Sequence, residues 1–155
     1  MENSAKEYLM QVKRYEAIIK SKQEERAWLY GIATNVTGAW REDAYSTSSG
    51  SQNNLENIMA KVADLDAEIN SEIDNLIEKR KEIVNMIDRL NDLEEIRVLR
   101  LLYIGLIDEE EGTTKYPKWK WIAKIIHTSV RTAQRIHGRA LKNFSEILKV
   151  DAVCR

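Results

Sequence analysis

The sequence predicts an all-α protein in which a long, coiled-coil-like helical hairpin precedes a second, smaller helical domain. Apolar residues recur every seven positions from Leu55 to Leu90, which is typical of a long helix packed along a partner. Glycine and proline are scarce, with 6 Gly and 1 Pro in 155 residues, so sandwiches and barrels are disfavoured. A content of 32% charged and 43% apolar residues is typical of amphipathic helices.

The first predicted domain covers residues 1–90 and begins with a single helix. Residues 2–30 carry apolar side chains at mostly helical spacing among charges, which predicts an amphipathic helix ending near Gly31. Residues 31–53 are rich in Gly, Ser, Thr and Asn, and they predict a flexible loop.

The seven-residue repeat of the following helix predicts a coiled-coil seam. It keeps one apolar stripe against a partner helix, either the first helix of the same chain or a second copy. The sequence leaves an antiparallel hairpin, a short helical bundle and a homodimer through residues 55–90 equally open. The repeat consists of Leu55, Val62, Ile69, Leu76, Ile83 and Leu90, with Ile58, Leu65, Ile73, Met86 and Ile87 beside it.

A second domain is predicted over residues 91–150, followed by a tail at 151–155. Its first helix covers residues 93–106 and ends at or soon after Gly105, and the acidic run 108–114 predicts a solvated loop.

Two further helices in this domain are joined by a very short connection. Residues 118–126 predict a short helix with Pro117 suited to its first turn, and Ser129 is a good N-cap for a helix over about 130–144. With the small residue Ala123 at the expected close approach, this spacing predicts a helix-turn-helix.

The net charge of −1 conceals two opposed segments. Residues 1–114 contain 14 basic and 23 acidic side chains, whereas residues 115–155 contain 10 basic and 2 acidic ones. This asymmetry predicts an acidic framework that carries a module for binding a polyanion.

The polar face of the last helix predicts double-stranded DNA as the partner. Arginine can pair two-pronged with guanine and glutamine with adenine in the major groove, while further basic residues neutralise phosphates. The predicted base-reading residues are Arg131, Thr132, Gln134 and Arg135. The predicted phosphate-binding residues are Lys118, Lys120, Lys124, Ser129, Arg139 and Lys142.

Residues 93–148 resemble region 4 of bacterial sigma-70-type factors. The matching residues are Glu95, Arg97, Leu99 and Leu101, then Ile122, Ala123, Ser129, Ile136, Ala140 and Leu141. The resemblance implies base-facing positions for Arg131, Thr132, Gln134 and Arg135. Trp121 stands where the family carries an acid, so no promoter preference is implied. The wider layout is similar to phage and prophage late-transcription regulators of the ArpU and RinA type, which implies transcription regulation.

No enzyme, metal or cofactor signature is present in the sequence. His127 and His137 lack Cys, Asp or Glu at ligand spacing, and phosphate-cradling glycine motifs and nucleophile elbows are absent. The single cysteine, Cys154, excludes a disulfide framework, and no apolar run reaches the length of a membrane span. We therefore expect a cytoplasmic protein that is not an enzyme.

Two other functions fit the same layout. A small terminase-type DNA-packaging subunit also joins a helix-turn-helix to helical oligomerisation segments. Alternatively, the region-4-like end could bind RNA polymerase rather than DNA. The Arg- and Gln-bearing face favours DNA binding over the polymerase alternative.

Overall fold

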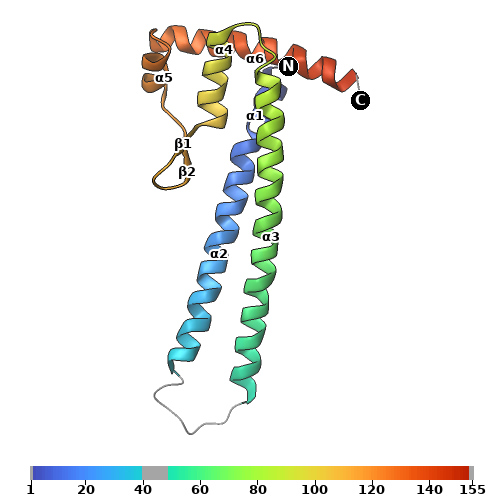
Figure 1. Cartoon of the computed structure of the whole chain (residues 1–155), viewed down its shortest axis with the longest axis vertical. Helices are drawn as coiled ribbons and strands as arrows, with labels where there is room; N and C mark the ends of the chain where they lie inside the picture. Colours follow the sequence, from blue (N-terminus) through green and yellow to red (C-terminus); the bar gives the residue numbers. More distant parts are fainter. Residues whose placement is uncertain (1, 40–48, 154–155) are drawn as a thin grey trace. The chain divides into compact units, whose positions relative to one another are not determined.

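The computed structural model describes residues 2–39 and 49–153, and most of them are helical (Figure 1). The prediction of a mainly helical protein is therefore confirmed. In chain order the elements are α1 (Glu2–Leu9), α2 (Gln11–Ala39), α3 (Ser49–Ile87), α4 (Leu93–Leu99), the π-helix η1 (Arg100–Ile104), β1 (Leu106–Asp108), β2 (Thr113–Lys115), α5 (Trp119–Ile125) and α6 (Val130–Val153).

The chain divides into two compact units. The middle unit is Tyr15–Leu76, and the terminal unit combines Met1–Arg14 with Ile77–Arg155. The predicted domain boundary near residue 90 lies elsewhere, because the first helical residues and the last turns of α3 pack with the C-terminal elements.

In the middle unit, α2 and α3 pack side by side in opposite directions (Figure 1). Lys22 of α2 pairs with Glu68 at 2.8 Å. Seven residues further along α2, Leu29 packs against Val62 and Leu65 of α3. The residues of α3 that are buried here, including Val62, fall on the predicted apolar seam. Their burial stabilises the pairing of the two helices.

Both ends of the segment 31–53, which the sequence predicts to be a loop, are helical. Helix α2 continues through Gly31 to Ala39, and α3 begins at Ser49. Glycine costs a helix only about 1 kcal/mol relative to alanine, so Gly31 does not have to end α2. Residues 40–48, the rest of the predicted loop, lie outside the described residues.

The terminal unit is built around α6, which packs against α1, α4 and α5. Phe144 of α6 is fully buried, and its ring lies 6.2 Å from that of Tyr8 in α1. The Tyr8 hydroxyl donates a hydrogen bond to Glu82 of α3. Tyr8 therefore links α6 to α1 through Phe144 and to α3 through Glu82.

The sequence predicts a solvated loop for the acidic run 108–114. In the structure this run instead forms the end of a β-hairpin. Strands β1 and β2 pair antiparallel, with Leu106 opposite Lys115 and Asp108 opposite Thr113. The Asp108 carboxylate accepts hydrogen bonds from the backbone N–H groups of Glu110 and Glu111 at the turn and pairs with Lys115. These contacts stabilise the hairpin. The run of acidic residues does not by itself predict a hairpin.

Gly105 ends η1, as the sequence predicts, and directs the chain into the hairpin. Its φ of 74° and ψ of −173° belong to a region that is essentially restricted to glycine. A Cβ atom at this position would lie 2.7 Å from Cγ2 of Thr114 and 2.8 Å from the carbonyl oxygen of Lys115. The junction therefore requires glycine for both its conformation and its space.

Candidate nucleic-acid interface

The short helix α5 begins after Lys118, two residues beyond Pro117. The sequence predicts Pro117 in the first turn of this helix, but in the structure Pro117 lies before the helix. The ring of Trp119, at the start of α5, meets His137 of α6 edge-on, with 5.5 Å between the ring centroids. His137 also hydrogen-bonds the buried hydroxyl of Tyr103 at 2.9 Å, and burial raises the pKa of that hydroxyl. These contacts fix the start of α5 against α6.

The turn between α5 and α6 is closed by two backbone hydrogen bonds. The N–H of Thr128 donates to the carbonyl of Ala123 at 2.9 Å, and the N–H of His127 donates to that of Lys124 at 3.2 Å. This is a Schellman motif with His127 in the left-handed conformation at φ 56°. Glycine is the usual residue there, so the sequence did not reveal how α5 ends.

Ser129 caps α6 as predicted. Its hydroxyl oxygen accepts a hydrogen bond from the backbone N–H of Thr132 at 3.2 Å and donates one to the Thr132 hydroxyl oxygen at 2.9 Å. The first turn of α6 is thereby ordered before any ligand is present. Thr132 is half-buried and participates in the cap, whereas Arg131 beside it is exposed.

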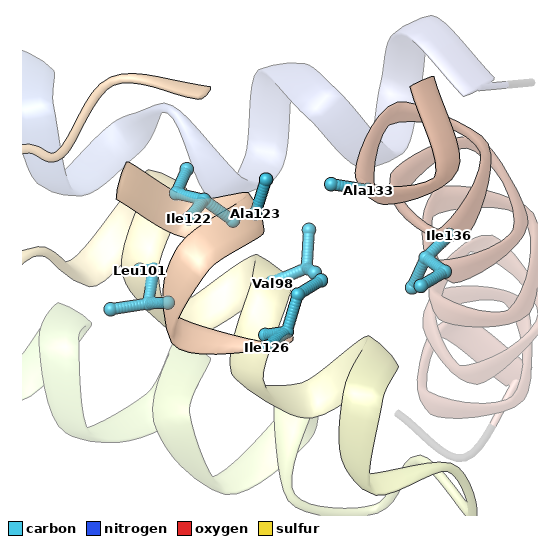
Figure 2. Packing of buried hydrophobic residues seen from close by; sticks show 7 residues of the cluster. All are labelled: Val98, Leu101, Ile122, Ala123, Ile126, Ala133 and Ile136. Carbon is cyan, nitrogen blue, oxygen red and sulfur yellow. The ribbon is translucent and has the colours of Figure 1, made fainter. Parts of the chain in front are cut away.

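An apolar cluster fixes the two helices against α4 and η1. Figure 2 shows side chains from α4, η1 and α5 gathered opposite those of α6. Ala123 and Ala133 are both almost fully buried, so small residues occupy this interior. The cluster comprises Val98, Leu101, Ile122, Ala123, Ile126, Ala133 and Ile136.

The predicted base-reading side chains lie on the outer side of α6. Arg131, Gln134 and Arg135 are exposed, while Ala133 and Ile136 between and beside them face the cluster. At about 100° per residue, Arg131 and Arg135 fall on one stripe of the helix.

Six basic side chains around this surface are exposed and, within the part of the chain that the structure describes, form no ion pair. They are Lys118, Lys120, Lys124, Arg131, Arg135 and Lys142. By contrast, Lys115 pairs with Asp108 and Lys149 with Glu146 at 2.7 Å. We call the six residues the basic face. They leave a concentrated positive charge over α5 and the first half of α6.

Arg139, predicted to contact phosphate, is already engaged within the protein. Its guanidinium donates to Glu95 at 2.6 Å and to Asp92 at 2.7 Å, and the hydrogen bond to Glu95 raises the pKa of Arg139. Glu95 is only 2% exposed, and Asn143 donates to both of its carboxylate oxygens. Arg139 therefore positions α6 on α4.

The burial of the Glu95 carboxylate, which orients the candidate interface through Arg139, was not among the sequence predictions. Glu95 lies three residues before Val98 and four before Leu99, both fully buried, so an acid on the apolar side of a helix was the available signal. Its partners stand more than forty residues away in the chain, and no local pattern connects them.

Neither a metal centre nor a membrane span is found in the described segments. No group of three or more His, Cys, Asp or Glu side chains there could hold a metal ion. Across residues 2–39 and 49–153, every helix is too short or too polar to cross a bilayer. Cys154 and the last residue of the predicted tail lie outside the described residues.

Comparison with known protein families, with curated proteins and with solved structures finds no match to this chain. The resemblance to sigma-70 region 4 thus stays a prediction, and any function has to be argued from the side chains themselves.

Proposed function

We propose that the chain binds double-stranded DNA sequence-specifically, with α5, the turn and α6 acting as a helix-turn-helix. The observation that carries the proposal is the basic face. Its six exposed cations have no acidic partner in the described structure, and a polyanion would supply one. Residues 130–144 of α6 would lie in the major groove.

The roles divide by side-chain chemistry. Arg131, Gln134 and Arg135 occupy the first turns of α6, where side chains of a recognition helix reach base edges, and Thr132 stands among them. The lysines at 118, 120, 124 and 142 are suited to phosphates, to which a flexible ammonium group brings a point charge. Ser129 contributes by capping the helix that presents these residues.

The acidic charge of the remaining elements is consistent with a regulator whose N-terminal part does not contact DNA. The acidic residues of segment 1–114 would repel the duplex and confine contact to α5 and α6. With its resemblance to sigma-70 region 4, the chain would act as a phage or prophage transcription regulator in the cytoplasm. In this proposal α2 and α3 form an antiparallel coiled-coil hairpin. A homodimer through residues 55–90 would use the exposed side of α3, because seam residues such as Val62 and Ile83 are buried within one chain.

Selection of duplexes from a random pool by the full chain, followed by anisotropy titration, tests the proposal. We expect a defined consensus, and Arg131→Ala or Arg135→Ala should each weaken binding to it by about 1–3 kcal/mol. Lys142→Ala should weaken all duplexes alike. Lys149→Ala is the matched control, because that exposed lysine of α6 already pairs with Glu146. A pool without consensus, or unchanged affinity in both arginine variants, would contradict the proposal.

Light scattering on the same samples separates the packaging alternative. A transcription regulator is expected as a monomer or dimer, whereas a terminase-type subunit would form a ring of many copies. RNA polymerase retained by a chain that binds no duplex would favour the polymerase-binding alternative.

A further inference from the structure

A second charged surface lies in the terminal unit, and none of its lining residues belongs to α6. It is a groove of about 710 Å³ lined by residues of α3, α4, η1, the start of β1 and the end of α5. Its apolar lining includes Leu101 and Ile104, which are buried, and Val84 and Ile125, which are half-buried. The volume is typical of a binding site rather than of a packing defect.

Arginines surround this apolar lining. Arg80 from α3, Arg97 from α4 and Arg100 from η1 all line the groove. Arg100 pairs with Asp88, but within the described residues no carboxylate lies within ion-pair distance of Arg80 or Arg97. The groove therefore presents two guanidinium groups whose charge is unmatched. Guanidinium groups bind carboxylates in a two-pronged geometry.

The apolar surface continues beyond the groove onto the hairpin. Leu106 and Ile107 belong to its lining, yet they remain 47% and 65% exposed. A small molecule held in the groove would leave much of these side chains in water, whereas a polypeptide segment crossing the groove could cover them. Two neighbouring, exposed, large aliphatic side chains beside an apolar groove are typical of an interaction surface.

We propose that this groove binds an acidic, amphipathic segment of a partner protein. Apolar anchors of the segment pack on Leu101, Ile104 and the hairpin side chains, while its Asp or Glu residues pair with Arg80 and Arg97. The apolar lining disfavours duplex DNA, whose exposed backbone has few groups to bury there. The groove shares no residue with the basic face, but His127 of the turn between α5 and α6 also lines it, so separate variants are needed to test the two interactions.

Selection of random 16-residue displayed peptides on the immobilised full chain tests this inference. Enriched peptides should combine at least two large apolar residues with flanking Asp or Glu. A fluorescent synthetic copy should bind more weakly as salt rises. Arg97→Ala and Arg80→Ala should each reduce its affinity by up to about fivefold, the range of partly exposed ion pairs. Ile107→Ala should also reduce it.

Two controls keep the inference separate from the proposed function. Arg131→Ala, on the basic face, should leave peptide affinity unchanged, and Arg97→Ala should leave duplex affinity unchanged. Because all of these side chains are exposed or half-buried, the variants are expected to fold.

Several results would overturn the inference. They are no enrichment, enrichment of basic or uncharged peptides, or peptide affinity that Arg97→Ala and Ile107→Ala leave unchanged. A loss of duplex affinity in Arg97→Ala equal to that in Arg135→Ala would assign the groove to DNA. Self-association that Ile107→Ala abolishes would assign it to a second copy of the chain.

Discussion

Replacing Gly105 by alanine is expected to destabilise the terminal unit strongly. Alanine in the backbone conformation at φ 74° and ψ −173° costs about 1–3 kcal/mol. The added Cβ would also lie 2.7 Å from Cγ2 of Thr114 and 2.8 Å from the carbonyl oxygen of Lys115, far inside normal contact distance. Since the carbonyl belongs to β2, the hairpin has to shift, and such overpacking costs about 1–3 kcal/mol more.

The expected loss of about 2–6 kcal/mol is measurable by urea unfolding of the full chain, followed by tryptophan fluorescence. Gly138→Ala is the matched control. Gly138 lies in α6, and a Cβ there would meet nothing within 4 Å, so this variant should gain about 0.5–1 kcal/mol. Adding Thr114→Ser to Gly105→Ala removes the contacting methyl and should recover part of the loss. A Gly105→Ala variant within about 0.5 kcal/mol of the parent would refute this reasoning.

Three further predictions concern the supports of the candidate interface and the β-hairpin. Arg139→Ala should lower the melting temperature by several degrees more than Arg135→Ala in the same helix. The reason is that loss of Arg139 leaves the buried Glu95 carboxylate paired with Asn143 among these two partners. Equal melting temperatures of the two variants would contradict this. His127→Gly should raise the free energy of unfolding by up to about 1 kcal/mol, because glycine adopts φ 56° without strain, and a loss in urea unfolding would count against the turn geometry. The hydrogen bond from Lys115, with those from the Glu111 and Glu110 N–H groups, lowers the pKa of Asp108 below its ordinary 3.8. The contribution of the Asp108 carboxylate to the stability of the hairpin is therefore present above about pH 4, and it is lost as the pH falls through the lowered pKa. Asp108→Asn should remove the part of the acid-range shift of the Glu110 and Glu111 amide resonances that comes from the Asp108 carboxylate, and identical shifts in the parent and in Asp108→Asn would exclude this role.

The elements with strong local signals are those that the sequence predicts correctly. The seven-residue repeat locates the buried side of α3 at Val62, Ile69 and Ile83, because burial and helical period act together. Ser129 caps α6 because a hydroxyl at that position satisfies a free backbone N–H. Gly105 ends its helix because only glycine tolerates the required conformation.

The errors occur where distant contacts outweigh local preference. The hairpin at 106–115 depends on strand pairing and on the Asp108 interactions, which an acidic stretch does not indicate. The tight turn at 127–129 is predicted correctly, but not its left-handed His127, because a non-glycine residue rarely takes that conformation. The arginine that resembled a phosphate ligand, Arg139, differs from Arg135 only through Glu95 and Asp92, which are far away in the sequence.

The salt dependence of duplex binding by the full chain tests the central claim most directly. Four phosphate-binding lysines predict a slope of about −3.6 in a plot of log affinity against log salt, or roughly a hundredfold loss between 50 and 200 mM. Lys142→Ala should make that slope shallower by about 0.9, while Lys149→Ala should leave it unchanged. No duplex binding at 50 mM salt, or binding with a slope near zero, would contradict the assignment of the basic face to DNA.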